Sequence, residues 1–421
     1  MPMPASSTDT FAACIGLDWA SKKHDVALQP SNSDVVELSV LPHTPEAIHA
    51  WVAQLRDRFE GQPVALCTEQ KQGALIYALC QYDFIVLYPV NPQTVAKYRR
   101  AFTPSRAKDD PTDACILLEL LLKHRDKLTA WQPGSSQIRE LQKLVEWRRK
   151  FVDDGVRLTN RITDILKGYY PQALDWFTDK NTLVFCDFLT QYPTLEAAQQ
   201  EASDQLNQFF LAHHCRYKKT NAKRIEQIKA ATPLTNDVGV IEPSKMIVKA
   251  LAFQLRTLLL SIEQFNERIE QLFAQMPEAD LFAALPGAGE HLAPRLLLAF
   301  GEERSRFSSA QELLQYAGIA PVTERSGKKD WVHWRWSCPK FLRQSFVEWA
   351  EQSRQHSFWA KAFYEAQKRK GKTHQEAIRA LAFKWIRIIW RCWQDRKPYD
   401  EAKYLLALKK KGSPLVAQLA L

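Results

Sequence analysis

The sequence lacks the features that would place the chain in a membrane or outside the cell. It has no run of about 18 apolar residues, the length at which a helix can cross a bilayer. Its first residues lack the basic segment and the long apolar core of a secretory signal. Eight cysteines are scattered without a CxxC pair, which is typical of reduced, mostly buried thiols. We therefore expect a cytoplasmic protein with no membrane partner.

The chain is long and carries its positive charge unevenly. With 421 residues it exceeds the usual size of a single domain, so two or three domains are expected. Lys and Arg outnumber Asp and Glu by 57 to 47, which gives a net charge of +10. From residue 281 to the end the counts are 25 and 13, so the preceding part is slightly acidic. A basic C-terminal third indicates a polyanionic partner, either nucleic acid or an acidic membrane surface.

One stretch, residues 107–119, carries two carboxylates at the start of a predicted helix. Asp109 or Asp110 is a suitable N-cap, and Pro111 suits the first helical position. Asp113 then lies in the first turn, on the same helix face as Asp110. The helix beyond is apolar, so it should pack against a large surface. Two ionised carboxylates at this helix end suit a hard divalent cation such as Mg²⁺. For this stretch alone, a capped helix start that faces water explains the pattern equally well.

Residues 12–130 are predicted to form an α/β domain around a mixed central sheet, because a strand hairpin comes first and strands then alternate with helices. The strands are expected at 14–18, 25–28, 35–40, 63–68 and 84–90, with helices at 44–59, 73–81 and from 110. Acids end the first strand (Asp18), follow a later strand (Glu69) and begin the last helix (Asp110, Asp113). That order is the arrangement of a ribonuclease-H-like fold, whose carboxylates converge on one or two Mg²⁺ ions. Taken singly, Asp18 or Glu69 could be a strand-end acid that faces water.

Sugar kinases and actin-like ATPases also open with an apolar strand, an Asp and a second strand. Those folds use glycine-rich turns to bind the phosphates of ATP. The turn after Asp18, residues 19–23, contains no glycine, and no GxxxxGK[ST] motif occurs in the chain. The sequence therefore favours the nuclease-like arrangement over the kinase-like one.

Residues 131–275 are predicted to form a long helical arm. Apolar residues recur at three-to-four spacing up to Tyr170 and again over 244–275, which predicts two long amphipathic helices. Residues 175–245 between them read as a small helical insertion without an assigned task. The two helices can form an antiparallel coiled-coil arm or a dimerisation element. Their basic faces can contact nucleic acid, although solvated charge explains them as well.

Residues 276–400 are predicted to form a mainly helical C-terminal domain, followed by a basic tail at 401–421. The segment Leu-Pro-Gly-Ala-Gly, which contains Gly287 and Gly289, is similar to a helix-hairpin-helix turn. The backbone N–H groups of such a turn can meet a DNA phosphate. Any tight turn between helices also favours glycine, so a purely structural turn is the alternative.

A further motif places a serine among cations in a flexible turn. Ser326 precedes a glycine and is flanked by Arg325, Lys328 and Lys329. An exposed hydroxyl in this setting suits attack on a phosphate, because the cations offset the charge that develops. From the residues alone, a basic hairpin turn that contacts the DNA backbone is the alternative. Tryptophans interleaved with cations such as Arg335 follow, and some of these rings could stack on bases while others form the core.

Several motifs follow one another in a recognisable order along the chain. They are GLDWASK around Asp18, Glu69 at a strand end, VNP at 90–92, KDDPTDA at 108–114, and the PGAG and RSGK segments within 286–329. With these motifs the sequence resembles, over nearly its whole length, a known family of insertion-sequence transposases. Members of this family pair an N-terminal RuvC-like DEDD domain with a C-terminal serine transposase domain, and the pilin-gene DNA invertases are their relatives.

The resemblance implies a DNA recombinase that excises and inserts its mobile element. It implies that Ser326 attacks a DNA phosphodiester and forms a phosphoserine link. It also implies a site for one or two Mg²⁺ ions made by Asp18, Glu69, Asp110 and Asp113. The expected partners are donor and target DNA, a structured guide RNA encoded beside the gene, and further copies of the chain in a dimer or tetramer. The expected location is the cytoplasm of a prokaryotic cell, with action at the nucleoid.

The sequence departs from the family pattern at three places. Residues 70–73, which follow Glu69, read Gln-Lys-Gln-Gly where the family has x-Thr-Gly. Ser326 stands alone where the family has two serines, and Ser337 in the next motif is a second, weaker candidate nucleophile. The middle insertion is longer than in the shortest members.

Two other functions stay open at this point. A RuvC-like junction nuclease would use metal-activated water, and Ser326 would only contact DNA. A non-catalytic regulator that binds nucleic acid would keep the acids without breaking a strand.

Overall fold

The computed structural model describes residues 11–70, 73–102, 110–327, 329–413 and 415, and the side chains of residues 102, 110 and 111 are not described. The chain divides into two compact units, Met1–Pro133 and Gly134–Leu421. Within the described ranges, no helix has the length and apolar character that crossing a bilayer requires.

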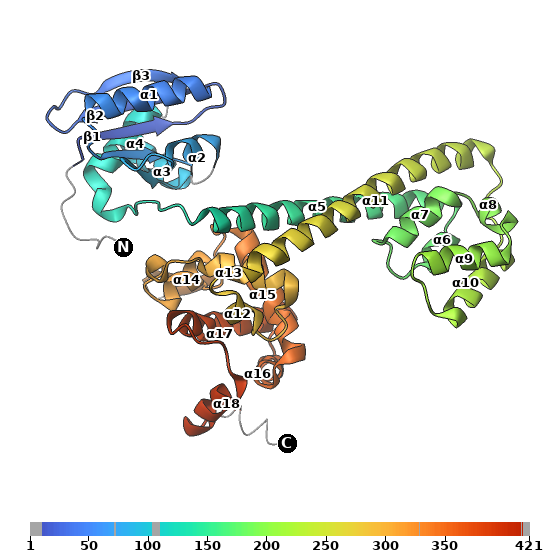
Figure 1. Cartoon of the computed structure of the whole chain (residues 1–421). Helices are drawn as coiled ribbons and strands as arrows, with labels where there is room; N and C mark the ends of the chain where they lie inside the picture. Colours follow the sequence, from blue (N-terminus) through green and yellow to red (C-terminus); the bar gives the residue numbers. More distant parts are fainter. Residues whose placement is uncertain (1–10, 71–72, 103–109, 328, 414, 416–421) are drawn as a thin grey trace. The chain divides into compact units, whose positions relative to one another are not determined.

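A five-stranded mixed sheet forms the centre of the first unit (Figure 1). Its strands are β1 (Ala13–Asp18), β2 (Lys23–Pro30), β3 (Glu37–Pro42), β4 (Val64–Thr68) and β5 (Ile85–Pro89). The strand order is β3-β2-β1-β4-β5. β2 pairs antiparallel with β1 and with β3, whereas β4 pairs parallel with β1 and with β5. The predicted hairpin and mixed sheet are confirmed, and the architecture is compatible with a ribonuclease-H-like domain.

Four helices cover the two faces of this sheet, and a 3₁₀ turn (Arg125–Lys127) follows the last of them. They are α1 (Pro45–Arg58), α2 (Ala74–Leu79), α3 (Pro92–Phe102) and α4 (Asp110–His124). Side chains alternate between the faces of a strand. Accordingly, Ile15 and Leu17 of β1 lie in one apolar cluster with α1 and α2, whereas Cys14 lies in a second cluster with α3 and α4. Thr44 caps α1 through the N–H of Ala47, as the sequence predicts.

The helix α4 lies unusually close to the centre of the sheet at Gly16 of β1. A Cβ atom on Gly16 would lie 2.1 Å from the backbone oxygen of Ala114 and 2.4 Å from the backbone nitrogen of Leu118. Only glycine leaves room for this contact between two backbones. The absence of a side chain at residue 16 therefore sets how near α4 approaches β1 and β4.

The second unit contains a long two-helix arm. α5 (Ser136–Tyr169) and α11 (Val238–Ala274) run side by side in opposite directions, with Phe151 against Phe265 at a ring distance of 5.3 Å (Figure 1). The helices between them are α6 (Gln172–Trp176), α7 (Leu183–Gln191), α8 (Leu195–Gln200), α9 (Ser203–Ala212) and α10 (Lys218–Ala230). They share an apolar core with the C-terminal part of α5 and the N-terminal part of α11.

The start of α11 differs from the expected one. The helix begins at Val238 rather than at Ser244, and it contains Pro243. Proline is disfavoured within a helix, but Asp237 accepts the N–H of Gly239 and so caps an earlier start. A local cap therefore outweighs the break that proline would favour.

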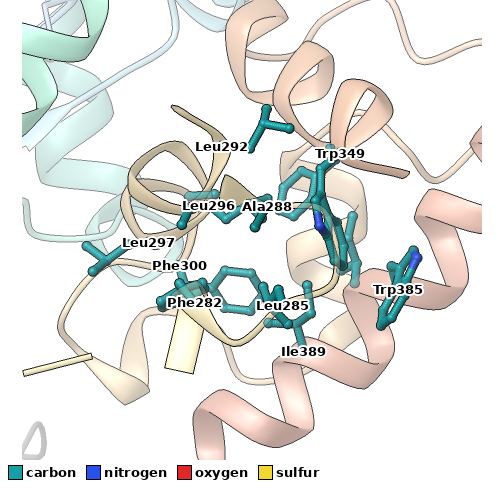
Figure 2. Close-up of a cluster of buried hydrophobic side chains, with 14 of the residues drawn as sticks. Phe282, Leu285, Ala288, Leu292, Leu296, Leu297, Phe300, Trp349, Trp385 and Ile389 are labelled. Carbon is teal, nitrogen blue, oxygen red and sulfur yellow. The ribbon is translucent and has the colours of Figure 1, made fainter. Parts of the chain in front are cut away.

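The remainder of the second unit is helical apart from one hairpin. Its elements are α12 (Ala279–Ala283), α13 (Gly289–Phe300), a 3₁₀ turn (Arg304–Arg306), α14 (Ala310–Tyr316), β6 (Val322–Ser326), β7 (Lys329–His333), α15 (Lys340–His356), α16 (Phe358–Arg369), α17 (His374–Gln394) and α18 (Glu401–Lys410). Trp349, Trp359, Trp385 and Trp393 are fully buried in one core, part of which Figure 2 shows. The prediction that much of the tryptophan stock is core is confirmed.

We expect Gly16→Ala to lower the unfolding free energy of the first unit by about 1–3 kcal/mol, because the added methyl group meets backbone atoms that no rotamer change can move. Thermal and urea unfolding of the full chain measure the loss. Gly168→Ala is the matched control, since Gly168 is an exposed residue of α5 whose Cβ would meet nothing within 4 Å. That variant should be more stable by about 0.5–1 kcal/mol. Equal stability of Gly16→Ala and the original chain would contradict the close contact.

Candidate active site

Two of the predicted acids lie at one edge of the sheet. β1 and β4 run parallel in a register that pairs Leu17 with Thr68, so Asp18 and Glu69 are the next residues at the carboxyl ends of the two strands. Asp18 lies two residues beyond Gly16 and therefore on the face that α4 covers. Glu69 lies two residues beyond Cys67, which packs in the α4 cluster, so it belongs to the same face. Both acids are partly exposed.

The helix α4 adds Asp113 to this face. Asp113 directly precedes Ala114, whose backbone meets Gly16, and its side chain is buried with 3% exposure. It forms an ion pair with Arg99 of α3, which balances its charge. The pair lacks hydrogen-bond geometry, since Asp113 Oδ1 and Arg99 Nε are both buried and no described group makes a hydrogen bond to either atom.

These residues fit a hard cation in their chemistry. Carboxylate oxygens are the ligands that Mg²⁺ prefers, and Asp113 Oδ1 is a buried acceptor that no hydrogen bond satisfies within the described ranges. The described acids do not make a complete metal site by themselves. Among the described residues, no group of three or more His, Cys, Asp or Glu is placed to hold a metal ion. Asp110 begins α4 as predicted, but its side chain and the whole of Asp109 lie outside what is described.

A fifth acid, Asp25, lies on the same face of the sheet, and the sequence patterns did not identify it. It is directly opposite Asp18 in the β1–β2 pairing and is only 6% exposed. Ala27, two residues on, packs in the α4 cluster, so Asp25 also belongs to the α4 face. Among the described residues, no hydrogen bond or ion pair engages its carboxylate. Once a hairpin is predicted with its turn after Asp18, the register places an acid opposite Asp18, and that signal could have found Asp25.

A histidine pair fixes the turn that follows Asp18. His24 Nδ1 accepts the backbone N–H of Ala20 at 3.3 Å, so its Nε2 carries the proton and donates to His43 Nδ1 at 2.9 Å. Trp19 stacks on the His24 ring at a centroid distance of 6.5 Å. Burial, together with the neighbouring His43, lowers the pKa of His24 to about 4. His24 is therefore neutral near pH 7 and holds the β1–β2 turn in place.

The candidate nucleophile Ser326 is the last residue of β6. It pairs with Lys329 across a turn in which Gly327 has a φ of +59°, a conformation that favours glycine. Arg325 precedes it and forms an ion pair with Asp330 at 3.1 Å. Ser326 is exposed, as the turn motif predicts. Lys328, the fourth member of the predicted cluster, lies outside the described residues.

The hairpin is a two-stranded ribbon, and Ser326 shares one of its faces with one cation, one acid and one tryptophan. Pairing in the ribbon places Ser326 and Lys329 on the same face as Glu324 and Trp331. Trp331 is 64% exposed, which is unusual for tryptophan in a soluble domain. The alternate candidate Ser337 is also exposed, in the segment that leads into α15.

The other predicted nucleic-acid contacts have structural roles as well. A Cβ on Gly287 would lie 3.0 Å from the backbone of Gln352, so this part of the turn packs against α15. Leu285 and Ala288 point into the core beside it (Figure 2). Gly289 has open space around it at the start of α13. Arg335 is partly buried and donates to the backbone oxygen of Ala320 at 3.4 Å.

Comparison with known proteins gives two family matches. A family model described as "Transposase" matches residues 15–171, which include nearly all of the sheet with its acids and the whole of α5. A second model, described as "Transposase IS116/IS110/IS902 family", matches residues 279–365, which include the Ser326 hairpin and the Gly287 turn.

Individual relatives agree with these matches. The chain is 27% identical to a protein of the IS117 mini-circle of Streptomyces coelicolor over 94% of this chain and 97% of that protein. It is 22% identical to the 43.6 kDa protein of insertion element IS110 from the same species, over 93% and 96% of the two chains. It is 33% identical to the pilin gene-inverting protein of Moraxella bovis over 152 residues, which are 34% of this chain and 46% of that protein.

The low pKa of His24 predicts a loss of stability in mild acid. The unfolded chain binds a proton near pH 6.5, whereas the folded chain does so only near pH 4, so the contribution of neutral His24 is full above pH 6.5 and falls toward pH 4. We expect about 2 kcal/mol of the decrease in unfolding free energy between pH 7 and pH 5 to come from this group. The decrease should be smaller by that amount in His24→Asn, measured by urea unfolding at each pH.

Proposed function

We propose that this chain is a transposase of the IS110/IS116 family and that it breaks and rejoins DNA with Ser326 as its nucleophile. The observation that carries the proposal is the position of this serine. It ends β6 beside a two-residue turn, exposed, with Lys329 opposite and Arg325 before it. A hydroxyl in this setting can reach a phosphodiester without moving any core residue.

In the proposed step, the Ser326 oxygen attacks the phosphorus of a DNA strand. A phosphorus–serine oxygen bond forms, the bond from phosphorus to one deoxyribose oxygen breaks, and the serine proton leaves as the freed deoxyribose oxygen takes up a proton. A hydroxyl of a second strand then attacks the phosphoserine and releases the serine. The phosphoserine link retains the energy of the phosphodiester bond that was broken, so rejoining needs no nucleotide cofactor. Lys329, which shares a face of the hairpin with Ser326, would offset the charge that gathers on the phosphate oxygens.

The acids at the sheet edge would hold one or two Mg²⁺ ions, which supply Lewis-acid stabilisation of the phosphate when bound. Asp18, Glu69, Asp110 and Asp113 are the proposed ligands, and Asp25 adds negative charge beside Asp18. Arg99 would release Asp113 or share it with the cation. The rigid turn held by His24 would keep Asp18 in register with Glu69.

The acids belong to the first compact unit and Ser326 belongs to the second. We propose that the active form is a homodimer or tetramer in which both sites act on the same DNA. The proposed substrates are donor and target DNA, aligned by a structured guide RNA. The resemblance of the motifs and the basic C-terminal third support these partners.

A metal-dependent junction nuclease that uses water is the second candidate. The buried carboxylates Asp113 and Asp25 favour it, since they concentrate negative charge for a metal in the first unit, and a metal-activated water would need no part of Ser326.

Ser326→Ala should abolish the covalent protein–DNA adduct and reduce strand breakage by at least about 10³-fold, because no other group supplies the attacking oxygen. The measurement is a denaturing gel of full-length protein incubated with labelled donor and target DNA, flanking RNA and Mg²⁺. Ser337→Ala is the matched control and should keep the adduct. Breakage that persists in Ser326→Ala without an adduct would establish the water-using nuclease instead.

Asp113→Asn should weaken Mg²⁺ binding by at least about 10-fold, since a neutral amide replaces a buried anionic ligand. Isothermal titration of the full chain with MgCl₂ gives the affinity without any need for catalysis. Asp25→Asn should weaken it less, because this acid contributes charge beside the proposed ligands. Asp83→Asn, at a side chain that is 96% exposed, is the control. Unchanged Mg²⁺ affinity in Asp113→Asn would remove this residue from the proposed ligand set.

A further inference from the structure

A basic groove lies at the base of the Ser326 hairpin. Trp334 directly follows β7 and lines the groove together with the N-terminal halves of α15 and α17. The groove has a volume of about 310 Å³. Its lining residues are Trp334, Lys340, Arg343, Gln344, Val347, Gln375 and Arg379.

The spacing of these residues explains how two helices make one surface. Lys340, Arg343 and Gln344 lie three to four residues apart on α15 and so share one helix face. Gln375 and Arg379 are four residues apart on α17 and do the same. The helices α15 and α17 pack against each other through Trp349 and Trp385, whose rings are 4.6 Å apart. The groove is therefore built on a rigid core.

The groove is cationic. Three of its seven lining residues are Lys or Arg and none is Asp or Glu. In the part of the chain that the structure describes, no carboxylate forms an ion pair with Lys340, Arg343 or Arg379. Of the acids nearby, Glu348 pairs with Arg295 at 2.6 Å and accepts a hydrogen bond from Gln344. Glu376 caps α17 through Thr373 and interacts electrostatically with Arg379, so it offsets only part of the charge of the three cations.

The two guanidinium groups are held in fixed positions. Arg343 lies 5.0 Å and Arg379 lies 4.0 Å from the centroid of the Trp334 ring. Arg343 also donates to the backbone oxygen of Arg335 at 3.2 Å. Cation–π contacts of this kind hold a charged group in place, so less conformational entropy is lost when an anion binds.

We propose that this groove binds the phosphodiester backbone of the DNA strand on which Ser326 acts. β7 has five residues, so about 16 Å of extended chain separates the groove from the turn beside Ser326. A duplex advances 3.4 Å per base pair, so the groove would meet phosphates within about five base pairs of the reacting one. Backbone contacts of this kind fix the register of the DNA without reading its sequence.

This inference rests on the proposed function for the choice of DNA as the polyanion and for the action of Ser326 on the bound strand. The test compares the full-length chain with Lys340→Gln/Arg379→Gln in binding a short DNA duplex of arbitrary sequence, by fluorescence anisotropy at about 50 to 200 mM salt. Removing two phosphate contacts should lower the slope of log K against log salt by about 1.8 and weaken binding at least about ten-fold. Lys361→Gln/Arg391→Gln removes the same charge from exposed positions outside the groove and should leave the slope nearly unchanged. Two single variants test the role of charge. Arg379→Gln removes one cation and should lower the slope, whereas Arg379→Lys keeps the charge and should have a slope close to that of the original chain.

The outcomes are distinguishable. An unchanged slope in the Lys340→Gln/Arg379→Gln protein, with an unfolding curve equal to that of the original chain, would overturn the proposal. A loss confined to a single-stranded RNA probe, with duplex DNA unaffected, would also overturn it. Persistence of strand breakage in Ser326→Ala would refute the proposed function, yet the slope change in the groove variant would still support the groove.

Discussion

The contact between Gly16 and the backbone of α4 is the constraint on which the acidic site depends. Because a Cβ at residue 16 would lie 2.1 Å from the Ala114 oxygen, the helix can approach the sheet only over a glycine. That approach carries Asp113 to the face on which Asp18 and Glu69 end their strands. A larger residue would move the helix, and the carboxylates would separate by the same displacement. The packing of α4 on the sheet therefore also sets how close the carboxylates lie to one another.

The two compact units differ in the charge that their candidate functional residues carry. The first concentrates negative charge on one face of a rigid sheet, where Arg99 balances part of it and the His24–His43 pair fixes the adjoining turn. The second carries exposed cations and the exposed hydroxyl of Ser326 on a two-stranded hairpin, beside a core of buried tryptophans.

Tryptophan serves the second unit in two ways. Trp349 and Trp385 are buried in the core, and their indole N–H groups donate to Pro286 and Ser353. Trp331 is exposed on the hairpin, and Trp334 lies beneath two guanidinium groups at its base. Large rings suit both tasks, since they supply packing area inside and a flat surface for cations or bases outside. The basic C-terminal third thus has a rigid support beneath its charge.

The sequence by itself determined the five strands of the first unit, the two long helices of the second, and the motifs that point to acids at strand ends and to Ser326 on a turn, because these depend on local spacing. It missed the helix α3 between the last strand of the sheet and α4. It did not determine that Asp25 faces the acids, that Arg99 pairs with Asp113, or that Lys340 and Arg379 share a groove with Trp334. It also placed the start of α11 too late, where a cap at Asp237 outweighed Pro243. Those relations follow from strand register and from helices packed across long sequence distances. Only the tertiary structure decides which side chains then meet, because periodicity gives the face of an element but not its neighbour.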